Sequence, residues 1–192
     1  MYIISGCNGS GKTTASYTAL PEMLSCAQFV NSDEFAKSFS PFNPEAASIA
    51  AGRFMLLKIR YLLERGENFC IETTLATRSL MRIIEDAKSK GYEVTLLYFW
   101  LSSPEMAVSR VKARVASGGH GIPENVIFRR YGMGLHYFFN DYMAMCDRWM
   151  LFDNSELKMK KIASGEGLNF EINDLQAWSR IRSSEDTFRQ NK

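Results

Sequence analysis

Short apolar runs of strand type alternate with longer segments of helical type from one end of the chain to the other. The predicted strands are residues 2–5, 28–33, 68–74, 93–101 and 148–155, and the predicted helices are residues 11–24, 43–66, 78–90, 103–115 and 123–146. Two further strand-like pieces, 160–167 and 169–173, precede a helix that is predicted to begin at Asp174.

This alternation predicts the class of fold. Strands that alternate with helices form right-handed βαβ units, so we expect a mostly parallel sheet of five or six strands with helices on both faces. The run at 93–101 is the most apolar, as expected of a strand that is buried on both faces. The helix over 43–66 has signals at both ends, with Asn43 as its N-cap and Gly66 just past its last turn. A length of 192 residues favours a single domain over residues 1–192.

Ligands of parallel sheets bind beyond the carboxyl ends of the strands, and a glycine-rich loop follows the first strand. The loop satisfies the Walker A pattern G-x-x-x-x-G-K-[ST], and it lies between a strand and a helix, which is the context that the motif requires. Its backbone N–H groups would surround a β-phosphate, the lysine would reach the β- and γ-phosphates, and the first threonine would ligate Mg²⁺. The predicted nucleotide-binding residues are Gly6, Cys7, Asn8, Gly9, Ser10, Gly11, Lys12, Thr13 and Thr14.

Carboxylates follow the next two predicted strands. Asp33 could accept the proton of an acceptor hydroxyl or hold that hydroxyl in line with a γ-phosphate, or it could only cap a turn. Glu72 could support the Mg²⁺ shell or hydrogen-bond an acceptor, and Thr74 follows it closely. Arg78 could bind an anionic group of the substrate or be an ordinary surface arginine.

A segment around 110–130 carries arginines on both sides of a Gly-Gly-His-Gly break. Phosphoryl transfer is accelerated by positive charge that is directed at the γ-phosphate, so this segment is predicted to be a mobile lid that closes over the nucleotide. Arg114 and Arg130 are the lid residues that we expect to act in catalysis, with Arg110 and Arg129 as further candidates. His120 could bind phosphate or be an exposed loop residue.

Composition excludes several other classes of protein. The net charge is +2, from 23 basic and 21 acidic residues without a basic block, so nucleic-acid binding is not expected. The four cysteines form no CxxC pair, which argues against a disulfide framework or a structural zinc site. The longest apolar run, about 94–101, is too short to span a membrane. We therefore expect a cytoplasmic protein with no membrane partner.

With these residues the chain resembles the zeta-toxin-like family of P-loop kinases. The resemblance rests on "GCNGSGKTT", "FVNSDEFAKSFSPFNPEAA", "IETTL" and "RVKARVASGGHGIPENVIFRRY", with "FDNS" downstream. It implies a three-layer P-loop NTPase fold of nucleotide-kinase type, ATP and Mg²⁺ as cofactors, and phosphorylation of a hydroxyl. In the toxins proper the acceptor is a UDP-linked N-acetyl sugar, and an antitoxin docks on an extension before the glycine loop that this chain lacks.

The resemblance also implies roles for individual residues. By position, Lys12 and Thr13 would hold the ATP phosphates and the metal, and Asp33 would activate the acceptor hydroxyl. Glu72 and Thr74 resemble the acceptor-binding pair of the family.

The lid departs from the family pattern. Arg114 resembles its first arginine, but the second has no clean counterpart: His120 lies near that position, and Arg129 or Arg130 could substitute from the next helix. Thr73 stands where the toxins tend to have glycine, which would narrow the acceptor pocket.

The predicted function is therefore an ATP-dependent kinase that phosphorylates a hydroxyl of a small molecule, such as a UDP-N-acetyl sugar or a similar metabolite. The alternative is a nucleotide-binding switch or ATPase that phosphorylates no acceptor. A kinase of nucleic-acid ends would need a basic groove, which the near-neutral balance of charge disfavours.

Overall fold

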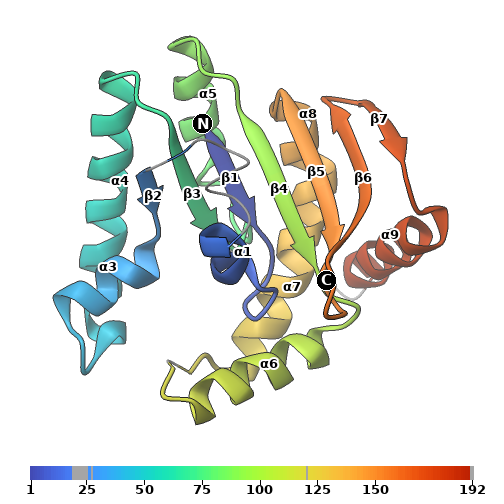
Figure 1. The fold of residues 1–192 in the computed structure, drawn as a ribbon, viewed down its shortest axis with the longest axis horizontal. Helices are drawn as coiled ribbons and strands as arrows, with labels where there is room; N and C mark the ends of the chain where they lie inside the picture. Colours follow the sequence, from blue (N-terminus) through green and yellow to red (C-terminus); the bar gives the residue numbers. More distant parts are fainter. Residues whose placement is uncertain (19–25, 27, 120, 191–192) are drawn as a thin grey trace.

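The computed structural model describes residues 1–18, 26, 28–119 and 121–190, and this part of the chain folds around one seven-stranded sheet (Figure 1). The order across the sheet is β2-β3-β1-β4-β5-β6-β7. The strands are β1 (Tyr2–Ser5), β2 (Gln28–Val30), β3 (Phe69–Thr73), β4 (Thr95–Trp100), β5 (Arg148–Asp153), β6 (Lys160–Glu166) and β7 (Asn169–Ile172). The first five strands are parallel, which confirms the predicted class of fold.

The number of strands differs from the five or six that the sequence predicts. Both tail pieces join the sheet, because β6 pairs antiparallel with β5 and β7 pairs antiparallel with β6. Gly167, with φ +54°, lies in the tight turn of this hairpin, where a left-handed conformation favours glycine. The parallel part that carries the predicted site residues is unaffected by this addition.

Helices cover both faces of the sheet, as predicted. They are α1 (Lys12–Thr18), α3 (Ser32–Phe39), α4 (Ser48–Glu64), α5 (Met81–Ser89), α6 (Pro104–Ala116), α7 (Glu124–Tyr137), α8 (Met143–Met145) and α9 (Leu175–Gln190), with a 3-10 turn η1 (Pro44–Ala47) and a π turn η2 (Phe138–Tyr142). In Figure 1, α1 lies on one face of the sheet and α7 on the other. None of these helices, within the ranges described, is long and apolar enough to span a membrane.

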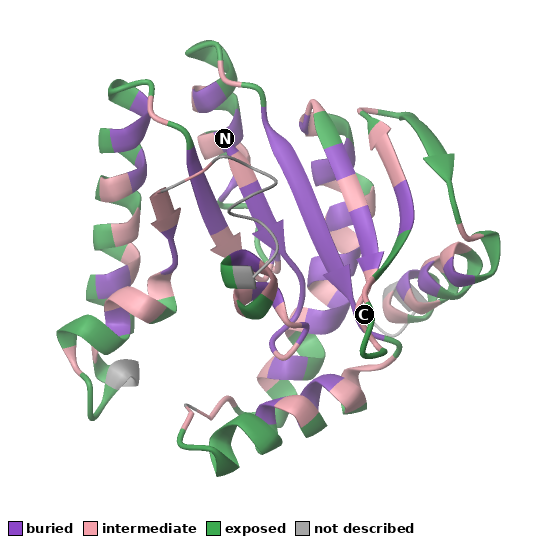
Figure 2. Ribbon diagram, in the orientation of Figure 1, coloured by how far each residue is buried: buried purple, intermediate pink, exposed green. Residues whose placement is uncertain are grey.

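The central strand β4 shows how the chain fills the space on both faces. Tyr98 and Trp100 belong to the larger apolar cluster, together with residues of α7. Leu97 and Phe99 alternate with them and belong to the smaller cluster, against which Ala15 of α1 packs. All six residues of β4 are buried, and Figure 2 shows burial concentrated on the central strands. The most apolar run of the sequence is therefore the strand buried on both faces.

Several predicted boundaries differ from the observed ones, and at two of them an asparagine cap explains the difference. The strand predicted over 28–33 ends at Val30, because Asn31 caps α3 and its Oδ1 accepts the N–H of Asp33 at 2.8 Å. The helix predicted over 43–66 begins later, at Ser48, because Asn43 instead caps the 3-10 turn by accepting the N–H of Ala46. Its end is as predicted, with Gly66 at φ +67°.

Two predicted helices differ in extent from the observed ones. The helix predicted over 123–146 is interrupted by the π turn η2, in which Phe138 and Tyr142 are fully buried. The helix predicted over 11–24 is α1 as far as Thr18, and its remainder lies outside the described residues.

Candidate active site

The three glycines of the phosphate loop have conformations that other residues rarely adopt. Gly6, Gly9 and Gly11 have φ values of 139°, 79° and 84°. A Cβ added at Gly6 would lie 2.2 Å from the carbonyl oxygen of Phe99, and one added at Gly9 would lie 2.8 Å from that of Ala107. The loop can therefore turn this tightly against β4 and α6 only because these positions are glycine.

The loop buries a cation and an unpaired hydroxyl. Nζ of Lys12 donates to the carbonyl oxygen of Cys7 at 2.8 Å, and only 6% of the residue is exposed. Burial lowers the pKa of Lys12, and the negative charges of Glu72 and Asp33 oppose this shift. Oγ of Ser10 is buried without a hydrogen-bond partner among the described residues. Both groups suit the oxygens of a bound phosphate.

Thr13 and Glu72 are brought together by the strand order. Glu72 in β3 pairs with Ile4 of β1, two residues before the loop begins. Oγ1 of Thr13 lies 2.9 and 3.1 Å from the two carboxylate oxygens of Glu72 and donates to that carboxylate. Burial raises the pKa of Glu72, and the positive charge of Lys12 opposes the rise. The hydroxyl of Thr13 and the carboxylate of Glu72 therefore meet at the carboxyl ends of two neighbouring strands.

Asp33 is placed by a helix and not by a strand end. It lies in the first turn of α3 and is exposed to solvent, and its charge interacts with those of Lys12, Glu72 and Arg130. Its neighbour Glu34 pairs with Lys37 on the surface at 2.8 Å. Asn31, and not Asp33, caps this helix. The carboxylate of Asp33 is exposed and acts on the charges of the site through electrostatic interaction.

Arg130 of α7 contacts the phosphate loop directly. Its Nη1 donates to Oδ1 of the buried Asn8 at 3.1 Å, across 122 residues of sequence. Burial lowers the pKa of Arg130, and the charge of Asp33 opposes this shift. Arg129, one position earlier, is exposed. The structure therefore places Arg130, and not Arg129, beside the loop.

The other lid residues differ in their surroundings. Arg114 lies in the last turn of α6 and is exposed, and its charge adds to the effect of burial in lowering the pKa of Lys12. Arg110 donates from Nη2 to the carbonyl oxygen of Ser155 at 2.9 Å. His120 lies outside the described residues. Movement of this segment stays a prediction.

The residues after β3, where the acceptor is predicted to bind, differ in how far they are buried. Thr74 is partly buried, and its carbonyl oxygen lies so close to α7 that a Cβ added at Gly134 would be 2.6 Å away. Leu75 is buried with φ +57°, and its N–H donates to Oγ1 of Thr73 at 3.1 Å. Arg78 is exposed and pairs with Asp141 at 3.2 Å, which favours the surface-arginine alternative.

Comparison with known proteins identifies the family. The family model described as "Zeta toxin" matches residues 1–133, which include the phosphate loop, Asp33, Glu72 and Arg130. The chain belongs to the zeta toxin family. An uncharacterised protein of Haemophilus influenzae is 35% identical to this chain over 127 residues, which are 66% of this chain and 88% of that protein.

Solved structures show the same fold. Two structures of an AvrRxo1-ORF1:AvrRxo1-ORF2 complex, one with sulphate ions and one with ATP, superpose with TM-scores of 0.75 and 0.73. In both, the matched chain is 18% identical, and the match covers 96% of this zeta toxin family chain and 63% of that chain. A chain from the PezAT toxin–antitoxin system of Streptococcus pneumoniae is 16% identical with a TM-score of 0.61, covering 99% and 86%. This chain thus spans less than two thirds of the AvrRxo1 chains.

The turn after β5 contributes contacts that the sequence did not predict. Nδ2 of Asn154 donates to the carbonyl oxygen of Ser10 at 2.8 Å and so supports the phosphate loop of this family member. Asp153 accepts the N–H and the hydroxyl of Ser155, and Oγ of Ser155 accepts the N–H of Ser102 at 2.8 Å. The signal for these contacts was a polar turn at the carboxyl end of a central strand.

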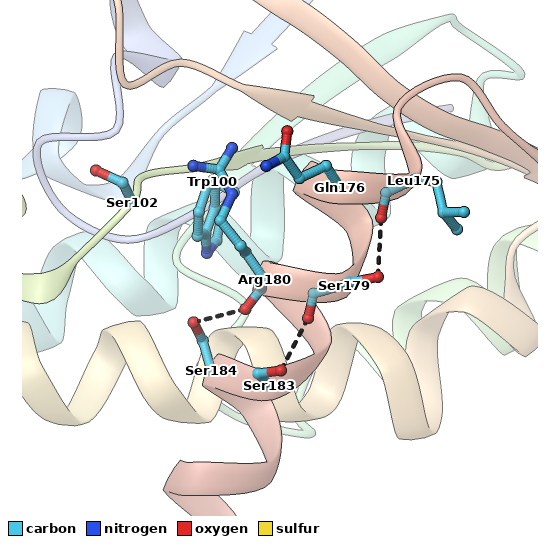
Figure 3. A pocket seen from close by; sticks show the side chains of 8 residues that line it. All are labelled: Trp100, Ser102, Leu175, Gln176, Ser179, Arg180, Ser183 and Ser184. Carbon is cyan, nitrogen blue, oxygen red and sulfur yellow. Dashed lines mark hydrogen bonds between the residues drawn. The ribbon is translucent and has the colours of Figure 1, made fainter.

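A pocket of about 840 Å³ lies elsewhere, between the end of β4 and α9 (Figure 3). Of its serines, Ser179, Ser183 and Ser184 donate to backbone carbonyls within α9, so their hydroxyls are already paired. None of the residues that line it is a predicted site residue. The arrangement of reactive groups therefore favours the phosphate loop as the active site.

Proposed function

We propose that this chain is an ATP-dependent kinase that transfers the γ-phosphoryl group of ATP to a hydroxyl of a small molecule. One observation carries the proposal: Arg130 reaches the phosphate loop at Asn8, and its charge interacts there with that of Asp33. A nucleotide-binding switch needs the loop but has no need of a carboxylate from α3 opposite an arginine from α7. Membership of the zeta toxin family and the ATP complex of AvrRxo1-ORF1:-ORF2 support this proposal.

The residues of the loop fit ATP and Mg²⁺. Lys12 and the unpaired Oγ of Ser10 would bind phosphate oxygens, and the hydroxyl of Thr13 would ligate Mg²⁺. Glu72 orients that hydroxyl through its hydrogen bond. Mg²⁺ at this position would supply positive charge to the β- and γ-phosphate oxygens.

Asp33 would hold the acceptor hydroxyl and accept its proton on a carboxylate oxygen as the new P–O bond forms. Arg130 and Arg114 would stabilise the negative charge on the transferred group. Thr74, beside Glu72, would help to bind the acceptor. AvrRxo1-ORF1:ORF2 and PezAT are two-protein systems, so an antitoxin-like partner is a further candidate for this chain.

The proposal is tested by an acceptor screen with Mg²⁺-ATP, in which mass spectrometry detects the gain of one phosphoryl group. The panel holds UDP-N-acetyl sugars, free sugars, nucleosides and amino-alcohols. We expect one class to be phosphorylated by the wild type, and we expect Asp33→Asn to lower that rate by about 100-fold or more.

Glu34→Gln is the matched control, because Glu34 is the next carboxylate along, pairs with Lys37 on the surface, and acts on Glu72 through its charge as Asp33 does. It should retain wild-type activity within about twofold. Equal release of ADP by all three proteins without any phosphorylated acceptor would overturn the proposal and favour the ATPase switch.

A further inference from the structure

Two of the four cysteines meet on the α1 face of the sheet. Cys70 lies in β3, where it pairs with Tyr2 of β1 and Phe29 of β2. Its side chain belongs to the smaller apolar cluster, and Cys26, which precedes β2, packs against the same cluster. Sγ of Cys26 donates to the carbonyl oxygen of Gln28, the first residue of β2, at 3.4 Å. The fold therefore brings the two thiols together from separate elements.

The two thiols differ in accessibility although they share one small apolar cluster. All four cysteines of the chain are free thiols. Cys70 is buried, with 5% of the residue exposed, whereas Cys26 is only partly buried. A thiol that reagents can reach thus lies against one that they cannot.

The electrostatics separate Cys26 from the other cysteines. The neighbouring side chain of Cys70 lowers the pKa of Cys26 to about 7 against the opposing effect of burial, and the amino group of Met1 adds a favourable charge. The neighbouring Cys26, together with burial, raises the pKa of Cys70. Burial raises the pKa of Cys7 to about 11 and that of Cys146 to about 12. At neutral pH Cys26 is the thiol with a substantial thiolate fraction.

We propose that Cys26 and Cys70 form a peroxide-reactive dithiol, in which Cys26 is the attacking thiol and Cys70 the resolving one. The Cys26 thiolate attacks hydrogen peroxide, the O–O bond breaks, and a sulfenic acid forms while hydroxide leaves and takes up a proton to give water. The Cys70 sulfur then attacks the Cys26 sulfur, the S–O bond breaks, and a second water leaves with the Cys70 proton. Two thiols are oxidised to a disulfide and one peroxide is reduced to two waters.

The pair lies next to the candidate active site without being part of it. Cys70 precedes Glu72 by two residues on β3, and Cys26 lies in sequence between α1, which carries Thr13, and β2. The dithiol chemistry stands whether or not the proposed kinase reaction does.

The test is oxidation of the reduced full-length protein with hydrogen peroxide, followed by mass spectrometry of the intact chain and of its peptides. We expect loss of two hydrogens and a Cys26–Cys70 cross-linked peptide, reversible by dithiothreitol. Cys70→Ser should stop at a Cys26 sulfenic acid that a 1,3-dicarbonyl probe traps. Cys146→Ser is the matched control and should oxidise at the wild-type rate. A cross-link between other cysteines, or none, would overturn the proposal.

A second measurement on the wild type needs no variant to fold. Alkylation by iodoacetamide at neutral pH should label Cys26 at least about tenfold faster than Cys146, because the thiolate is the reactive species. The Cys26 rate should rise with pH around a midpoint near 7, since deprotonation increases the reactive fraction. Equal labelling rates for Cys26 and Cys146 would contradict the assignment of Cys26 as the attacking thiol.

Discussion

The phosphate loop and the acceptor side of the site differ in how far the folded chain arranges their groups before any ligand binds. On the loop, Lys12 is buried and bonded to Cys7, Asn8 is bonded to Arg130, and Asn154 supports Ser10. On the acceptor side, Asp33 is exposed, Thr74 is only partly buried, and Arg78 pairs with Asp141.

This difference has a physical reason. A triphosphate is the same ligand for every member of a large class, so a rigid loop with fixed donors suits it, and preorganised donors are worth more than mobile ones. An acceptor must enter, be recognised and leave, and exposed groups on α3 and after β3 can do this without disturbing the core. Substitutions on each side should therefore differ in the size of their effects.

The largest expected effect is the loss of transfer on neutralising the buried cation of the loop. Lys12→Met keeps the length of the side chain but removes its charge, so phosphoryl transfer should fall by about 1,000-fold or more. Because a buried charge is costly, the variant should unfold at a temperature no lower than the wild type. Rates with Mg²⁺-ATP and a thermal melt measure both, and a loss of less than tenfold would show that the loop does not depend on this cation.

The next effect separates the two adjacent arginines of α7. Arg130→Ala should lower the transfer rate by about 100-fold, because it removes the cation bonded to Asn8. Arg129→Ala, at the exposed neighbouring position, should change the rate by less than about threefold. Steady-state kinetics measure the transfer rates of the two variants. Equal losses of rate would mean that α7 presents both arginines to the nucleotide.

Rigidity of the loop predicts a contrast between two glycines. Gly6→Ala should destabilise the fold by about 2–3 kcal/mol, because its Cβ would meet the Phe99 carbonyl at a φ of 139°. Gly52→Ala, inside α4 with nothing within 4 Å of the added Cβ, should stabilise it by about 0.5–1 kcal/mol. Urea unfolding measures both changes, and similar changes of one sign would refute the strained-loop interpretation.

The smallest effect is expected on the acceptor side. Arg78→Ala removes an exposed ion pair with Asp141, so the free energy of unfolding should change by less than about 1 kcal/mol. Transfer to the acceptor found in the screen should change by less than about threefold. A large rise in KM for that acceptor would restore Arg78 to the substrate site.

Much of the phosphate loop and its surroundings could be predicted, because the loop depends on residues that are close together in the sequence. The spacing of Gly6, Gly11, Lys12 and Thr13 defines the loop wherever a strand precedes it and a helix follows. Glu72 could be expected near Thr13 because neighbouring parallel strands end at the same edge of the sheet. The strand before Asp33 was predicted three residues too long, because the side chain of Asn31 caps α3 and so ends the strand at Val30. The role of Asp33 stays a prediction.

Other parts of the site depend on packing between distant elements. The sequence analysis preferred Arg130 and kept Arg129 as a further candidate. The contact with Asn8 follows from the packing of α7 on the sheet, which places Arg130 on the same side of the helix as Ile127 and Gly134. The contact of Asn154 with Ser10 could not be predicted, because the two residues are 144 positions apart in the sequence. The sequence showed only that Asn154 lies in a polar turn. The meeting of Cys26 and Cys70 depends in the same way on the pairing of β2 with β3.

By itself, the sequence determined the alternation of strands and helices, the phosphate loop and the membership of the zeta toxin family, because these depend on periodicity and on residues close together along the chain. The tertiary structure decided which arginine reaches the loop, that Arg78 turns to Asp141, and that two cysteines become partners. Those outcomes depend on the angles at which whole elements pack, and such angles follow from the combined burial of many side chains and not from any one stretch of sequence.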